Sequence, residues 1–203
     1  MACIKQSWTA MGGKISWILD PDTLISFSRD SISAFMVRKN NRVVGKLSGM
    51  ALSIPMIRLY WPVHSDSLKT SSIDLINSSQ SQWHIKKNLK REEFFVVIVV
   101  RNHIFATTIT AENHEDSSID WRISELKGGN LIDKQANLPD IVRQQCLSIV
   151  NYFRLNYPSI DFIKDPHRRY FSLELNPNGQ WAWIEQIVGY PIRDAIIDTL
   201  LAE

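Results

Sequence analysis

The sequence predicts an α+β protein that combines antiparallel strands with helices, and three observations predict it. The apolar run from Phe94 to Val100 is typical of a buried strand. Two runs of alternating apolar and polar residues, 159–164 and 171–176, flank a turn-like Asp-Pro-His-Arg and predict a hairpin. Residues 139–157 repeat apolar side chains at helical spacing after a proline, which predicts a helix.

Composition limits the class of protein. The chain has 203 residues, of which 44% are hydrophobic and 22% charged, as in ordinary globular proteins. A net charge of +2 does not by itself indicate nucleic-acid binding, and the histidines lack zinc-type spacing. Cys3 and Cys146 cannot form a disulfide framework, and residues 1–20 contain no secretory apolar segment. No apolar run is long enough for a membrane helix, so we expect a cytoplasmic protein without a membrane partner.

The first half of the chain predicts short elements. From Thr23 to Met36 we expect a strand, a turn at Arg29-Asp30 and a short helix, followed by an apolar strand that ends at Lys46. Residues 62–82 are rich in Ser, Asp and Lys and predict a loop, a short helix and a connector between two lobes. A last helix should follow Gly189, with Pro191 at its start.

The polar face of the predicted hairpin carries oxygen ligands. Glu174 and Asn176 lie two residues apart, and therefore on one face of their strand. If Lys164 faces Arg169, then Asp161 lies opposite Ser172, diagonal to Glu174 and on the same face. Two carboxylates and an amide oxygen suit Mg²⁺ that also binds nucleotide phosphates.

An alternative reading needs no metal. An amphipathic strand can carry Glu and Asn simply because one face is wet, and Asn-Pro-Asn-Gly after it is a good turn. A register slip of one residue would also move Asp161 to the other face of the sheet.

The order of these motifs is similar to that in a known family. Asp161 in Ser-Ile-Asp-Phe-Ile, the segment Leu-Glu-Leu-Asn-Pro-Asn-Gly-Gln-Trp at 173–181 and Gly-Tyr-Pro-Ile-Arg-Asp-Ala at 189–195 resemble the C-terminal end of ATP-grasp ligases. The chain looks like the microviridin-type, peptide-maturing branch, whose relatives add glutamate to a ribosomal protein. The resemblance implies two α+β lobes with a nucleotide between them, and Mg²⁺ held at Asp161, Glu174 and Asn176 to bind ATP.

The resemblance also implies a nucleotide site and a catalytic cation. Lys46, in Lys-Leu-Ser-Gly after Pro-Asp-Thr-Leu-Ile-Ser at 21–26, matches a lysine that binds phosphate. The run Gln82, Trp83, His84 and Ile85 occupies the place of a strand whose backbone pairs with adenine, although the family usually has Glu where Trp83 stands. Arg122, in Asp-Trp-Arg, is the candidate cation near the transferred phosphate, because a strand position where the family has Arg reads Phe-Phe-Val-Val at 94–97.

The implied organisation has three parts: an irregular N-terminal remnant at 1–20, a smaller lobe at 21–81 and a larger lobe with the metal site at 82–203. Ligases of this family carry a further N-terminal domain ahead of these lobes, and the resemblance begins only near Pro21. We expect either that this domain has been lost or that the chain is a fragment.

Three functions stay open at this point. The first is an ATP-dependent carboxylate–amine or carboxylate–hydroxyl ligase that forms an acyl phosphate on a peptide. The second is a weakened relative that binds nucleotide or peptide without turnover. The third is a nucleic-acid binder that uses the basic residues around Lys86 to Arg91 beside Trp83, although Glu92 and Glu93 offset that charge. A homo-oligomer also stays open.

Overall fold

The computed structural model describes residues 22–26, 28–40, 42–48, 66–67, 82–87, 89–90, 92–111 and 131–202. These residues divide into two compact units. Those up to Leu89 form the first unit, and those from Lys90 onwards form the second unit. Each unit combines a sheet with helix, so the predicted α+β class is confirmed.

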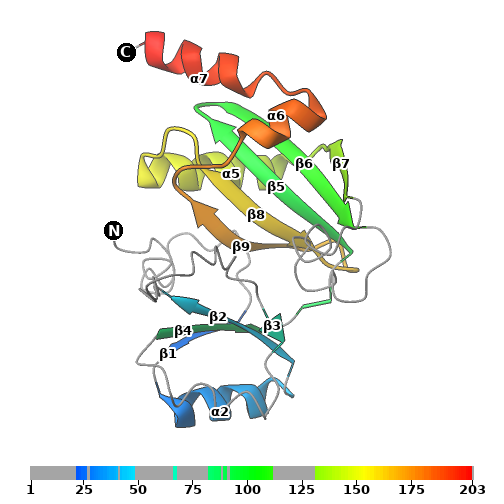
Figure 1. Cartoon of the computed structure of the whole chain (residues 1–203), viewed down its shortest axis with the longest axis vertical. Helices are drawn as coiled ribbons and strands as arrows, with labels where there is room; N and C mark the ends of the chain where they lie inside the picture. The colour runs from blue at the N-terminus through cyan, green and yellow to red at the C-terminus, as the bar shows by residue number, and fades with distance from the viewer. Residues whose placement is uncertain are drawn as a thin grey trace, which may run out of the picture. The chain divides into compact units, whose positions relative to one another are not determined.

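In the first unit one helix packs on a small antiparallel sheet (Figure 1). The strands are β1 (Thr23–Ser26), β2 (Val43–Ser48), β3 (Asp66–Ser67) and β4 (Gln82–Lys87), in the order β1-β4-β2-β3. The helix α2 (Arg29–Arg38) contributes most of the core. The core side chains are Ile32, Phe35, Met36 and Val43, with Leu24 packed against them.

Helix α2 begins earlier than the sequence predicted. Arg29 and Asp30 belong to the first turn of the helix, whereas we expected them in a polar turn before it. The reason is a cap, because the side chain of Ser28 accepts a hydrogen bond from the backbone N–H of Ser31. Asp30 in the first turn and Arg38 in the last turn both suit the helix dipole.

Strand β4 lies inside the first sheet, whereas we expected residue 82 to begin the second lobe. β4 is hydrogen-bonded on both sides, to β1 and to β2, so Ile85 lies opposite both Leu24 and Gly45. A strand with neighbours on both sides cannot be separated from its sheet without breaking two ladders. The division therefore falls after Leu89.

In the second unit five antiparallel strands form a sheet. They are β5 (Glu93–Val100), β6 (His103–Ala111), β7 (Leu131–Gln135), β8 (Ser159–Lys164) and β9 (Tyr170–Asn176), in the order β7-β6-β5-β8-β9. The predicted buried strand is thus β5, at the centre of the sheet, and the predicted hairpin is β8–β9.

Helix α5 (Asp140–Phe153) covers one face of this sheet (Figure 1). The helix was predicted as far as Tyr157 but ends at Phe153. Arg154 adopts a left-handed conformation with φ of 52°, and its N–H bonds back to the last turn. The buried helix residues Val142, Cys146, Ile149 and Val150 pack against sheet residues that include Val97, Ile160, Phe162 and Leu175. Each fully buried apolar side chain of this size stabilises the fold by roughly 1.5–3 kcal/mol.

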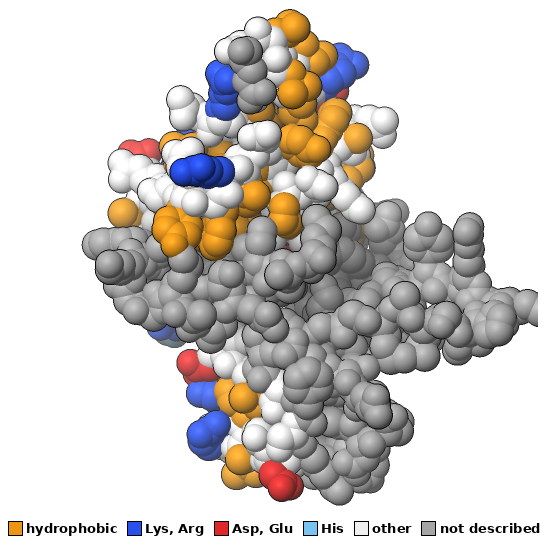
Figure 2. Space-filling view, turned by 90° about the vertical axis from the view of Figure 1, so that its left-hand side faces the viewer, with side chains coloured by type: hydrophobic (Ala, Val, Ile, Leu, Met, Phe, Trp, Pro, Cys, Tyr) orange, Lys and Arg blue, Asp and Glu red, His pale blue; other side chains and the backbone are white. Residues whose placement is uncertain are grey.

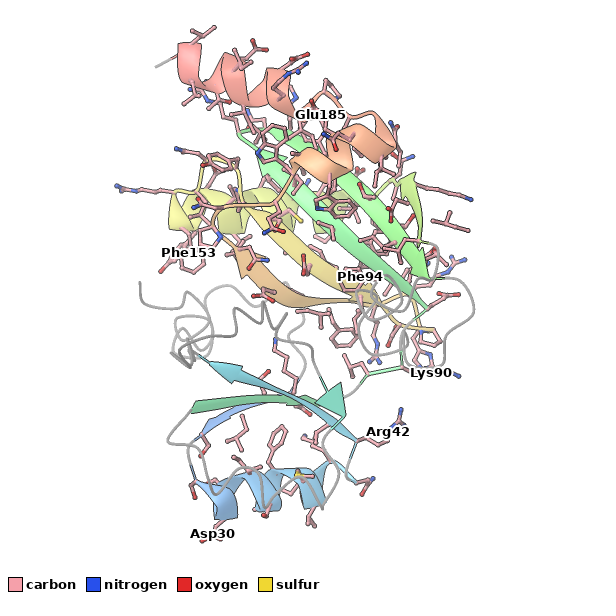
Figure 3. The ribbon with its side chains drawn as sticks, viewed as in Figure 1. Asp30, Arg42, Lys90, Phe94, Phe153 and Glu185 are labelled. Carbon is pink, nitrogen blue, oxygen red and sulfur yellow. The ribbon has the colours of Figure 1, made fainter. Side chains whose placement is uncertain are left out.

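Helices α6 (Ala182–Val188) and α7 (Ile192–Leu201) follow β9. The sequence predicted α7 but not α6, which is short and ends at Gly189 with φ of 78°. Tyr190 donates a hydrogen bond to the carbonyl of Ala106 at 2.6 Å, and its ring contacts that of Phe105. Glu185 of α6, labelled in Figure 3, accepts a hydrogen bond from the N–H of Arg193 at 2.6 Å.

Apolar side chains are also exposed on this unit, and Figure 2 shows them in orange at the end that carries α6 and α7. The most exposed are Ile187 on α6 and Leu200 and Leu201 on α7. In the described part of the chain, no helix is long and apolar enough to cross a membrane.

Candidate metal site on the second sheet

The hairpin β8–β9 has a different register from the predicted one. Lys164 pairs with Tyr170, not with Arg169, and Ser172 pairs with Phe162, not with Asp161. The loop is one residue longer than expected because the carboxylate of Asp165 holds Arg169 within it. Asp165 Oδ1 accepts hydrogen bonds from the N–H groups of His167 and Arg169, both at 2.9 Å.

A β-bulge then restores the contact that the sequence predicted. Without the bulge, the pairing of Lys164 with Tyr170 would place Asp161 opposite Leu173. The register shifts between Asp161 and Phe162, so that Asp161 lies directly opposite Glu174, and Ser159 lies opposite Asn176. The two carboxylates are therefore direct neighbours, whereas we expected a diagonal pair. Directly opposite residues share one face, which places Asp161, Glu174 and Asn176 on the same side of the sheet.

This side faces away from α5. Ile160, Phe162 and Leu175 alternate with the three polar residues and belong to the core beneath α5. The face of the sheet that α5 covers is filled by apolar packing. Only side chains on the opposite face, where the three polar residues lie, are therefore available for a ligand. Asp161 is only 5% exposed, and Glu174 and Asn176 are half-buried.

Two carboxylates face each other at this point of the sheet. Like charges directly opposite each other on paired strands destabilise a sheet, and burial of Asp161 adds a desolvation penalty. A divalent cation would relieve both effects, and the donor atoms are hard oxygens of the type that Mg²⁺ prefers. Among the described residues, no group of three His, Cys, Asp or Glu side chains has a metal-binding arrangement.

The loop after β9 folds back onto the start of β8. Asn178 forms a bridge with Tyr157, and the N–H of Gly179 donates to the carbonyl of Tyr157 at 3.1 Å. A Cβ atom at position 179 would lie 3.0 Å from the backbone nitrogen of Ser159 and 3.1 Å from its Cβ. The Asn-Pro-Asn-Gly segment is thus more than a turn, since its glycine allows this close approach beside Asn176.

The other end of the hairpin is held by ionic contacts that sequence reasoning missed. Arg169 donates to Asp165 Oδ2 from Nε at 2.8 Å and from Nη2 at 2.6 Å. Burial raises the pKa of Asp165, but the hydrogen bonds from Arg169 and from the backbone outweigh it and lower that pKa overall. Lys164 forms an ion pair with Glu93 on β5. The hydrogen bond between these two side chains is the main cause of the raised pKa of Lys164. The Asp-Pro pair at the turn was the available signal for Asp165.

A row of directly opposite residues crosses the whole sheet at the level of the carboxylates. It runs from Glu174 through Asp161, Val96 and Thr107 to Gln135. Val96, in the stretch where the family resemblance implied an Arg, therefore lies beside Asp161. Of the residues in this described row, none carries a positive charge. The hydroxyl of Thr107 is buried and has no hydrogen-bond partner among the described residues.

The predicted nucleotide residues lie on two neighbouring strands of the first unit. Lys46 on β2 is directly opposite His84 on β4, and the register continues through Trp83 and Gln82. Lys46 lies within β2, which continues to Ser48, whereas we expected the strand to end there. The pairing brings Lys46 together with the 82–85 segment at the level of the backbone. The side chains of Lys46 and 82–85, and the whole of Arg122, lie outside the described residues.

Comparison with solved structures identifies proteins of similar fold. A RiPP-associated ATP-grasp ligase from Chryseobacterium gregarium, solved with ADP and a leader and core peptide, matches with a TM-score of 0.78 and 19% identity. The match covers 97% of this chain and 58% of that one. The macrocyclase MdnC from Microcystis aeruginosa, bound with precursor peptide MdnA, matches with a TM-score of 0.72 and 25% identity over 91% of this chain and 55% of that one.

A more distant match is D-alanine–D-alanine ligase from Bacillus anthracis, with a TM-score of 0.59 and 16% identity over 98% of this chain and 66% of that one. The chain thus spans a little more than half the length of the two peptide ligases. A scan of protein-family models and a search of curated proteins gave no match.

Proposed function

From the ATP-grasp fold of this chain, we propose that it acts as a ligase that uses ATP to join a peptide carboxylate to an amine or a hydroxyl group. The observation that carries the proposal is the convergence of Asp161, Glu174 and Asn176 on one face of the second sheet. That convergence depends on a bulge in an edge strand, a local irregularity of the kind often found beside functional sites.

The residues have separate roles in this proposal. The oxygens of Asp161, Glu174 and Asn176 would hold Mg²⁺, which supplies positive charge against the triphosphate when bound. Lys46 would contact phosphate oxygens, and the backbone of 82–85 would pair with the adenine edge. Arg122 would neutralise charge on the transferred phosphoryl group. The solved neighbours with ADP and peptides support a site for both ligands.

The chemistry requires no covalent enzyme nucleophile. A carboxylate oxygen of the peptide forms a bond to the γ-phosphorus of ATP, while the bond from that phosphorus to ADP breaks. The amine nitrogen or hydroxyl oxygen then bonds to the acyl carbon, phosphate leaves, and the nucleophile gives up its proton to solvent. The protein contributes position and charge, which suit phosphoryl transfer.

The test is ATP turnover with carboxylate-bearing peptides. Purified protein with ATP and Mg²⁺ should form ADP together with a peptide that has lost one water. Glu174→Ala and Asn176→Ala should each lower this rate by ~10²-fold or more, because each removes a ligand of the Mg²⁺ that would supply positive charge against the triphosphate. Asp198→Ala, which removes an exposed carboxylate on α7, serves as the control. Equal turnover by Glu174→Ala and the unmodified protein would contradict the proposal.

A second function is favoured by Val96. A valine lies beside Asp161 in the stretch where the family resemblance implied an Arg, which suits a protein that holds nucleotide or peptide without turnover. Such a protein would bind Mg²⁺–ATP, lose that binding in Glu174→Ala, and form no ADP with any carboxylate peptide. The two functions therefore differ in ADP formation and not in nucleotide binding.

A further inference from the structure

Ser159 is the hydrogen-bond partner of the candidate amide ligand. Asn176 donates from Nδ2 to Ser159 Oγ at 3.5 Å, and the two residues face each other in the register of β8 and β9. Ser159 is buried, with 5% of its surface exposed. Ser159 also lies two residues from Asp161, on the same face of β8.

The direction of this hydrogen bond decides which end of the amide is available. An asparagine side chain has an oxygen, which can bind a cation, and an NH₂ group, which cannot. With Nδ2 directed to Ser159 Oγ, Oδ1 is the end left for a ligand. A flipped amide would instead present two N–H groups to the cation and repel it.

The position of Ser159 is itself closely determined. Gly179 packs closely against the backbone nitrogen and Cβ of Ser159. The N–H of Gly179 also donates a hydrogen bond to the carbonyl oxygen of Tyr157. The loop that begins at Asn176 therefore returns to the residue that orients Asn176. This close packing leaves the side chain of Ser159 few arrangements to adopt.

We propose that Ser159 is a positioning residue that orients the amide of Asn176 with its oxygen toward Mg²⁺ in the nucleotide complex. This inference rests on the proposed function, because it assigns Asn176 to the metal. Partners of metal ligands commonly change metal affinity by 10–100-fold when they are removed, and the hydroxyl of Ser159 has that place here.

The experiment separates the metal-dependent part of nucleotide affinity from the rest. Calorimetry measures the dissociation constant of a non-hydrolysable ATP analogue with Mg²⁺ and again with chelator present. The dissociation constant with chelator divided by that with Mg²⁺ gives a ratio that reports how much the metal strengthens binding. Ser159→Ala should lower this ratio by ~10-fold or more and leave the affinity in chelator unchanged. Ser172→Ala is the matched control, because Ser172 is buried in the same hairpin on the α5 face.

A double variant tests orientation against a general structural effect. In Asn176→Asp both terminal atoms are oxygens, so the direction of the side chain no longer matters. Adding Ser159→Ala to Asn176→Asp should therefore change the ratio by no more than about twofold, because the effect of Ser159→Ala acts through Asn176 and the two substitutions are not additive. A loss as large as in the single Ser159→Ala variant would overturn the inference.

The remaining outcomes distinguish the two proposals. If the unmodified protein shows a large metal-dependent ratio that Ser159→Ala leaves intact, the positioning role is wrong and the metal site stands. If the unmodified protein binds the analogue equally with Mg²⁺ and with chelator, the metal site proposed above fails, and the role of Ser159 fails with it.

Discussion

Gly179→Ala tests whether the loop after β9 needs a close approach to β8. The added Cβ would lie 3.0 Å from the backbone nitrogen of Ser159 and 3.1 Å from the carbonyl oxygen of Tyr157. Neither atom belongs to a flexible side chain, so the strand or the loop must shift. Overpacking of this kind costs about 1–3 kcal/mol of folding free energy. In a protein of this length, 2 kcal/mol corresponds to a fall of roughly 4–8 °C in melting temperature.

Two measurements are needed. Urea unfolding gives the free energy of unfolding, and calorimetry gives the ratio of the dissociation constants with chelator and with Mg²⁺. Gly179→Ala should lower both the free energy of unfolding and that ratio, because the displaced backbone carries Ser159. Gly189→Ala is the matched control: a Cβ there meets nothing within 4 Å, but its φ of 78° is strained for alanine. It should lower stability by about 1–2 kcal/mol and leave the ratio unchanged. Stability of Gly179→Ala equal to that of the unmodified protein would refute the close-approach reasoning.

Two further predictions concern titratable groups. The pKa of Asp165 is lowered in the fold, so its charged form stabilises the protein fully above ~pH 4, and this stabilisation disappears as the pH falls through the lowered value. Asp165→Asn should flatten the acid side of a stability–pH profile from urea unfolding; an unchanged acid slope would contradict this. Burial raises the pKa of the Cys146 thiol to about 12. Iodoacetamide at ~pH 8 should therefore leave Cys146 unmodified in folded protein and modify it in urea, as peptide mass mapping would show, whereas equal rates would contradict its burial.

Much of the second unit follows from local patterns. The apolar run at β5 and the alternation in β8 and β9 predicted a central strand and a hairpin, and both are present. Helix α5 was visible because Val142, Cys146 and Ile149 recur at helical spacing. Helix α6 was missed because it is short, so its few apolar residues establish no period. The family resemblance was carried by the same stretch and agrees with the solved neighbours.

The candidate metal site was predicted in its residues but not in its geometry. Glu174 and Asn176 could be placed on one face from sequence alone, because a strand has a period of two. Their relation to Asp161 could not, since the loop length depends on the hydrogen bonds of Asp165 and the register depends on a bulge beside Phe162. The two errors compensate: the longer loop alone would have separated the carboxylates, and the bulge brings them back together.

The sequence by itself determined the class of fold, the strands that carry oxygen ligands and the chemistry that those ligands suit, because residue type and short-range period are local properties. The tertiary structure alone decided that Asp161 faces Glu174 and that Ser159 meets Asn176 beneath Gly179. Pairing between strands depends on contacts between segments separated along the chain, and a change of one residue in register exchanges the two faces of a strand. For this reason the candidate ligands could be named from the sequence, whereas their convergence on one face required the folded sheet.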